Sequence, residues 1–177
     1  MNIEAGDSAF DFAINKIDEN NLSKVINKYI TRSIEVNNGF IKNSYSNDFL
    51  QRLSDDITEY CFLIQSCIFF NRHDLALKLE MHGIKLNLNR KLYNSILDFK
   101  SKFKSTLNID DIEFLNKVLD GFVKNGALLD IKTKQKYLYL KKELNHNYNE
   151  IYKILDKTET IKIELNNEII ELNKENY

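Results

Sequence analysis

The sequence contains no proline and no tryptophan, and only five glycines in 177 residues. Sheet-rich folds need many turns, and turns draw heavily on glycine and proline. Their scarcity argues against a turn-rich all-β architecture. It favours long helices joined by short polar loops.

The chain also lacks a large excess of charge of either sign and lacks a long hydrophobic run. Its formal net charge is -1, whereas a nucleic-acid-binding domain normally carries a marked excess of Lys and Arg. The most apolar run, Tyr60 to Phe70, is interrupted by Gln65 and Ser66. It is about half the roughly 20 residues that a membrane span needs, so it predicts a buried central helix. The first 16 residues match neither a secretory signal nor an Arg-rich transit peptide. We therefore expect a cytoplasmic protein with no nucleic-acid or membrane partner.

Cysteine is nearly absent, with Cys61 and Cys67 the only two. A spacing of six puts them on opposite sides of a helix, where they cannot form a local disulfide. Buried free thiols in a reducing compartment are the expectation.

No catalytic motif is present in the sequence. It has no HExxH, no glycine-rich phosphate loop, no CxxC and no recognisable Ser–His–Asp pattern. His73, His82 and His146 are expected to be surface or cap residues, and the adjacent acids Asp55 and Asp56 a solvated pair. We therefore expect no catalytic group, metal or cofactor, and a protein that is not an enzyme.

Apolar residues make up 43% of the chain and recur with a helical period along most of it. The pattern predicts one all-α domain over residues 1–177, an antiparallel bundle of about six or seven helices. The expected helices cover roughly 8–17, 22–36, 46–70, 73–99, 108–125 and 130–156. Two points stay open: whether Asn37 to Gly39 ends or bends the second helix, and whether Gly83 ends the fourth.

Gly126 is placed to end a helix in the left-handed conformation. Further on, Thr160 to Leu165 alternates polar and apolar residues, which is typical of a short strand. Residues 166–177 are expected to form a ragged or helical tail. Because a lone strand is unstable in water, the strand would need a partner or stay unpaired.

The long C-terminal helix and the strand supply a candidate partner-binding surface. For most of its residues, packing in the core is the favoured interpretation. The candidates are Tyr137, Tyr139, Tyr148, Tyr152, Ile161 and Ile163.

The stretch that begins GFVKNGALLDIKTKQKYLYLKKEL at residue 121 resembles the N-terminal region of the thimet oligopeptidase family of zinc metallopeptidases, which includes neurolysin and saccharolysin. The resemblance covers roughly residues 50–172. The matching residues are Arg90, Leu92, Tyr93, Phe99, Phe122, Asn125, Gly126, Leu129, Leu138, Leu140, Lys141, Lys142, Glu143, Leu144, Ile163 and Leu165.

The resemblance implies a helical domain of the kind that forms one wall of the peptidase channel. It transfers no zinc ligand or general base to this chain, because HExxH is absent. It favours a truncated or stand-alone, non-catalytic domain that binds a peptide or protein. One alternative is half of a split oligopeptidase that requires a separately encoded catalytic chain. The other is an unrelated helical interaction module, such as an immunity factor or adaptor.

Overall fold

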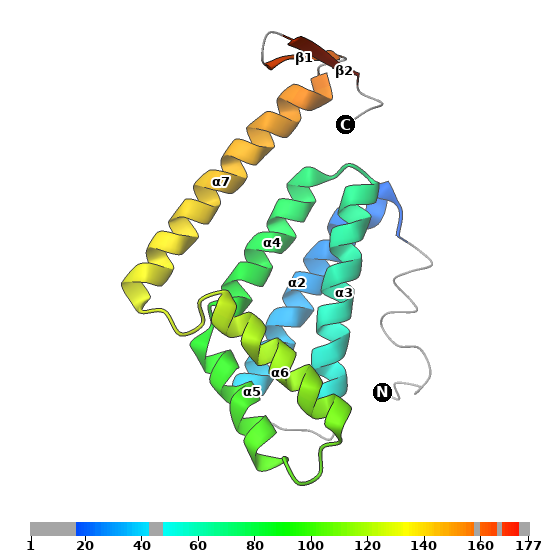
Figure 1. The fold of residues 1–177 in the computed structure, drawn as a ribbon. Coiled ribbons are helices and arrows are strands. Elements are labelled where there is room, and N and C mark those ends of the chain that lie inside the picture. Colours follow the sequence, from blue (N-terminus) through cyan, green and yellow to red (C-terminus); the bar gives the residue numbers. More distant parts are fainter. Residues whose placement is uncertain (1–16, 43–47, 158–159, 166–167, 174–177) are drawn as a thin grey trace. The chain divides into compact units, whose positions relative to one another are not determined.

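A computed structural model describes residues 17–42, 48–157, 160–165 and 168–173. This part of the chain is an all-α bundle with a short C-terminal hairpin, which confirms the predicted fold class (Figure 1). Its elements are α2 (Glu19–Ile41), α3 (Phe49–Phe69), α4 (His73–Asn87), α5 (Arg90–Lys102), α6 (Ile109–Lys124), α7 (Ile131–Lys157), β1 (Thr160–Leu165) and β2 (Glu168–Asn173).

The chain divides into two compact units, residues 1–138 and 139–177, so the expectation of one domain stays a prediction. The helix predicted near residues 8–17 lies almost wholly outside the described residues. No described helix is long and apolar enough to cross a membrane.

Helix α2 begins three residues earlier than predicted because Asp18 and Asn21 form a capping box. The Asp18 carboxylate accepts from the Asn21 amide at 2.9 Å, and the Asn21 side chain accepts from the Asp18 amide at 3.2 Å. Asn21 therefore takes part in the start of the helix. At the other end, α2 runs through Gly39 to Ile41, so the asparagine pair before Gly39 does not end it.

The predicted helix over 73–99 is two helices. Gly83 lies inside α4 and is not its cap, and the break falls at Leu88 and Asn89. The Asn89 side chain accepts from the amides of Lys91 and Leu92, and this cap starts α5. Asn108 and Asp130 bond the first-turn amides of α6 and α7 in the same way.

The core of residues 17–138 consists of two hydrophobic clusters. The first, called here the Leu63 cluster, joins α2, α3 and α4. It contains Leu22, Ile26, Tyr29, Leu63, Cys67, Leu75 and Leu79. The second, called the Phe49 cluster, extends to α5 and α6. It contains Phe40, Phe49, Leu53, Leu92, Ile96, Phe99, Leu115, Leu119, Phe122 and Ala127.

The most apolar part of α3 is not buried on all sides. Leu63 and Cys67 are in the core, but Phe69 is 80% exposed and Ile68 is 52% exposed. Cys61 is also exposed, so only one of the two thiols is buried as predicted. Burial follows one face of the helix because the neighbouring helices α2 and α4 cover only that face.

In the C-terminal unit, β1 pairs antiparallel with β2, and Ile163 lies opposite Ile170. The strand therefore finds its partner within the same chain. The predicted ragged or helical tail is wrong for residues 168–173, whose β-branched pair Ile169 and Ile170 favours a strand.

Gly126 has φ +93° and follows α6 closely, as the sequence predicted. Substitution of Gly126 by alanine should lower the free energy of unfolding by about 1–3 kcal/mol, because an L-residue is strained at this φ. A Cβ there would also lie 2.7 Å from Leu129 Cδ1. Urea denaturation measures the change.

The matched control is Gly39→Ala, inside α2, where a Cβ meets nothing within 4 Å. It should raise the free energy of unfolding by about 0.5–1 kcal/mol, because alanine has the higher helix propensity. Equal stability of the two variants would contradict the assigned role of Gly126.

Candidate functional site

Four polar side chains occupy core positions where the two hydrophobic clusters meet. Ser33 and Asn37 lie on the buried face of α2, Asp56 on that of α3 and His82 on that of α4. We call these four residues the polar layer. Along α2 the layer falls between Tyr29 of the Leu63 cluster and Phe40 of the Phe49 cluster. All four residues are at least nine-tenths buried.

The Asp56 carboxylate is the centre of the polar layer. Its Oδ2 accepts from Ser33 Oγ at 3.0 Å and from Asn37 Nδ2 at 3.3 Å. Ser33 Oγ lies 3.1 Å from His82 Nε2. Because the hydroxyl proton of Ser33 is donated to Asp56 Oδ2, His82 must carry a proton on Nε2 to bond the same serine oxygen.

The contact of Ser33, His82 and Asp56 differs from a nucleophilic triad. In such a triad the histidine stands between the acid and the serine. Here the serine stands between the other two, and its side chain is completely buried. The three groups therefore hold α2, α3 and α4 together, and Ser33 is not presented to a substrate.

Aromatic and ionic contacts surround the polar layer. The Tyr29 hydroxyl donates to the Asp56 carbonyl at 3.3 Å, and its ring meets the His82 ring edge-on at 5.9 Å. Burial, followed by the Asp56 charge, raises the Tyr29 pKa, so the hydroxyl remains a donor. Arg32 forms an ion pair with Glu59, so the charges of these two side chains compensate each other.

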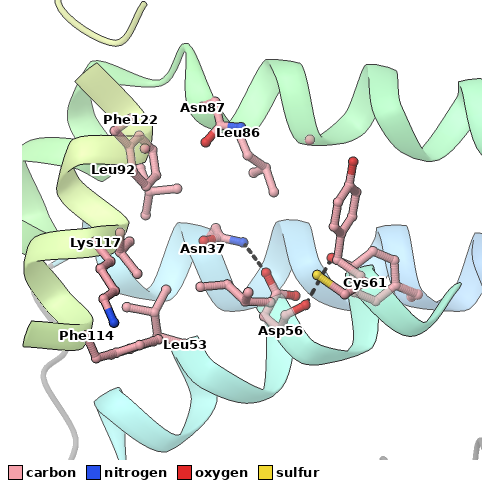
Figure 2. Close-up of a pocket in the computed structure, with 16 residues that line it drawn as sticks. Asn37, Leu53, Asp56, Cys61, Leu86, Asn87, Leu92, Phe114, Lys117 and Phe122 are labelled. Carbon is pink, nitrogen blue, oxygen red and sulfur yellow. Dashed lines mark hydrogen bonds between the residues drawn. The ribbon is translucent and has the colours of Figure 1, made fainter. Parts of the chain in front are cut away.

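A cavity of about 450 Å³ opens beside the polar layer among α2 to α6. This size falls in the usual range of ligand pockets. The walls are mainly apolar, and Asp56, Asn37, Asn87 and Lys117 are among the polar exceptions. Figure 2 shows the Asp56 carboxylate near the middle of the lining, with Lys117 toward one end. The apolar side chains are Leu53, Ile57, Leu86, Leu92, Phe114, Val118 and Phe122.

Two glycines shape this cavity. Gly121 of α6 lies in the lining, and a Cβ at this position would meet nothing within 4 Å. At Gly83 of α4 a Cβ would lie 2.9 Å from the Tyr60 hydroxyl. Burial, followed by the charge of Glu80, raises the pKa of Tyr60 to about 12, so this hydroxyl is a neutral donor in the wall.

The Asp56 carboxylate is only partly hydrogen-bonded. Its Oδ1 is buried and has no hydrogen-bond partner in the described part of the chain. Asp56 also takes part in none of the ion pairs found among the described residues. Buried carboxylates are normally paired or fully hydrogen-bonded, because removal from water is costly. Asp56 therefore keeps an unused acceptor on an oxygen that is shielded from solvent.

The sequence predicted neither Asp56 nor His82 as a buried residue. Asp55 is exposed as expected, but Asp56 is only 7% exposed, so the pair is not solvated as a whole. The signal was present in the spacing, because Leu53, Asp56 and Leu63 repeat on one helical face. His82 follows Leu75 and Leu79 in the same manner, and the expectation of a surface or cap histidine is wrong for it.

The predicted partner-binding residues lie elsewhere. Tyr137, Tyr139, Tyr148 and Tyr152 are on α7, and Ile161 and Ile163 are on β1. Tyr139 and Tyr148 are exposed, whereas Tyr137 and Tyr152 are half-buried. The side chains of the two isoleucines lie outside the described part. Tyr137, which belongs to the same unit as the cavity beside Asp56, does not line it.

Comparison of the chain with models of known families, with characterised proteins and with solved structures finds no significant match. The resemblance to the oligopeptidase N-terminal region therefore stays a prediction. Within the described ranges, no group of three or more His, Cys, Asp or Glu residues is arranged to hold a metal ion.

The polar layer predicts a pH dependence of stability. Burial lowers the pKa of His82, and Lys85 lowers it further against the opposing effect of Asp56. The unfolded chain therefore binds a proton that the folded chain does not. The contribution of His82 is complete above its unfolded pKa of about 6.5 and is lost as the pH falls toward its folded pKa.

His82→Gln keeps a donor for Ser33 and removes this titration. As the pH falls from 8 to 5, we expect the free energy of unfolding to fall more for the wild type than for this variant. Urea denaturation at several pH values measures it. A difference that stays constant over the range would contradict the assignment.

Proposed function

We propose that the protein is a non-catalytic binding module and that the bundle cavity receives part of a peptide or protein partner. The observation that carries the proposal is the 450 Å³ cavity, whose largely apolar wall includes a buried, incompletely bonded carboxylate. Ligand sites typically combine an apolar lining with a few well-placed polar groups.

The hydrogen bonds and packing of the wall support this role. Asp56 is held by bonds from α2, and α2 in turn contacts α4 through Ser33 and His82. The apolar part of the wall is continuous with the Phe49 cluster through Leu53, Leu92 and Phe122. A site on packed helices keeps its shape before binding, which reduces the entropy lost on association.

The cavity, rather than the α7 tyrosines, is the favoured site. It offers enclosed apolar surface together with a specific acceptor, whereas the tyrosines are spread along one helix. Their spacing puts Tyr137, Tyr148 and Tyr152 on a common face and Tyr139 away from it.

The test uses a library of random peptides displayed on phage, selected against the full chain. Selected peptides are synthesised, and their dissociation constants are measured for the wild type, Gly121→Leu and Gly39→Leu. Gly121→Leu adds a side chain to the cavity wall, where the space for its Cβ is open. The affinity of this variant for the selected peptides should fall at least about tenfold, which is the loss expected when a well-packed anchor residue is excluded.

Gly39→Leu is the matched control, because Gly39 also has open space around it but does not line this cavity. Both substitutions replace a helical glycine by a stronger helix former, so neither should unfold the protein. Three results would each overturn the proposal. They are an equal loss of affinity in both variants, no loss of affinity in Gly121→Leu, and a library that yields no binder.

A further inference from the structure

The C-terminal hairpin offers two strand edges. In the described part of the chain the sheet consists of β1 and β2, so each strand has a neighbour on one side only (Figure 1). The backbone groups on the other side of an edge strand can bond a further strand. A hairpin of two strands is only marginally stable in water, whereas three or more strands with an apolar face form a stable sheet. An added strand would therefore stabilise the hairpin.

The residues of the hairpin alternate strictly along β1. Successive residues of a strand belong to opposite faces of the sheet. The apolar face consists of Ile161, Ile163 and Leu165 of β1 with their neighbours Ile170 and Leu172 of β2. The opposite face of β1 carries one positive and one negative residue, Lys162 and Glu164. Within the chain, Lys162 lies opposite Glu171, and Glu164 lies opposite Ile169.

We propose that β1 pairs antiparallel with β1 of a second copy of the chain, with Ile163 opposite Ile163 of that copy. In this register Lys162 of each copy lies opposite Glu164 of the other, and Ile161 lies opposite Leu165. The two hairpins then form one four-stranded sheet with an apolar face and a charged face. This inference goes beyond the proposed function and does not depend on the bundle cavity.

Charge complementarity selects this register. Opposite charges directly across two strands stabilise a sheet, and like charges destabilise it. A slip of two residues in one direction puts Lys162 opposite Lys162 of the second copy, and in the other direction it puts Glu164 opposite Glu164. A slip of one residue moves the apolar set to the charged face. The register centred on Ile163 therefore avoids all of these conflicts.

The edge of β2 lacks this self-complementarity. Pairing of two β2 strands about Ile170 puts Ile169 opposite Glu171 of the second copy. Pairing about Glu171 puts two carboxylates opposite each other. A second copy of the chain therefore fits the edge of β1 and not that of β2.

The experiment follows self-association of the full chain by sedimentation equilibrium. We expect a reversible monomer–dimer equilibrium between about 10 µM and 1 mM, because an interface of one strand pair is at the small and weak end of the range.

Glu164→Lys should raise the dimer dissociation constant at least about tenfold, because two attractive cross-strand pairs become two repulsive ones. The change leaves the pair of Lys162 and Glu171 within the chain intact. Circular dichroism should give the same helical content and the same thermal unfolding as for the wild type.

The matched variant is Lys162→Glu combined with Glu171→Lys, which reverses the charge at position 162 and keeps opposite charges within the hairpin. By itself it should associate as weakly as Glu164→Lys. In a mixture of the two variants, both cross-strand pairs of a mixed dimer again join opposite charges. The mixed dimer should therefore form with about the wild-type affinity.

Three results would overturn the proposal. One is a wild-type chain that stays monomeric over the whole concentration range. Another is a dimer that Glu164→Lys does not weaken, or that mixing of the two variants does not restore, since another surface would then join the copies. The third is growth of the wild type beyond a dimer, which a head-to-tail contact produces. The variants change no residue of the bundle cavity, so the proposed function is tested separately.

Discussion

One buried carboxylate, that of Asp56, joins three helices of the bundle through its hydrogen bonds. Asp56 stands on α3 at the level where the Leu63 cluster ends and the Phe49 cluster begins. Its Oδ2 is bonded to two α2 side chains, and one of these, Ser33, bonds His82 of α4. Three antiparallel helices are therefore fixed at one register, because a shift of any helix would leave these groups buried and unpaired.

The same constraint connects the core with function. An apolar residue at position 56 could fill the core without any hydrogen bond, and replacement of buried charges by apolar groups is often stabilising. The observed arrangement satisfies only one oxygen of Asp56, a residue that also lines the cavity. A residue that is costly for folding and incompletely hydrogen-bonded supports the proposed binding site, because such residues are expected at functional or strained positions. The glycines at 83 and 121 leave the wall of this cavity free of further side chains.

Local sequence patterns predicted much of the fold. They did not predict the contacts between residues that are far apart in the sequence. Asp130 and the apolar period predicted α7 almost to the residue, and Gly126 has the expected positive φ. The burial of Asp56 was missed because its neighbour Asp55 suggested a solvated pair. The bonds of the polar layer join residues 23 and 49 positions apart, and no sequence motif encodes that meeting. The cavity is likewise formed by residues of five helices, so no single sequence segment could have predicted it.

The most direct measurement is a crystal structure of the full chain. We predict that Asp56 Oδ2 lies within hydrogen-bond distance of Ser33 Oγ and Asn37 Nδ2, and that Ser33 Oγ lies within the same distance of His82 Nε2. A well-ordered structure in which the Asp56 carboxylate faces solvent, or in which Ser33 and His82 do not meet, would contradict the central claim.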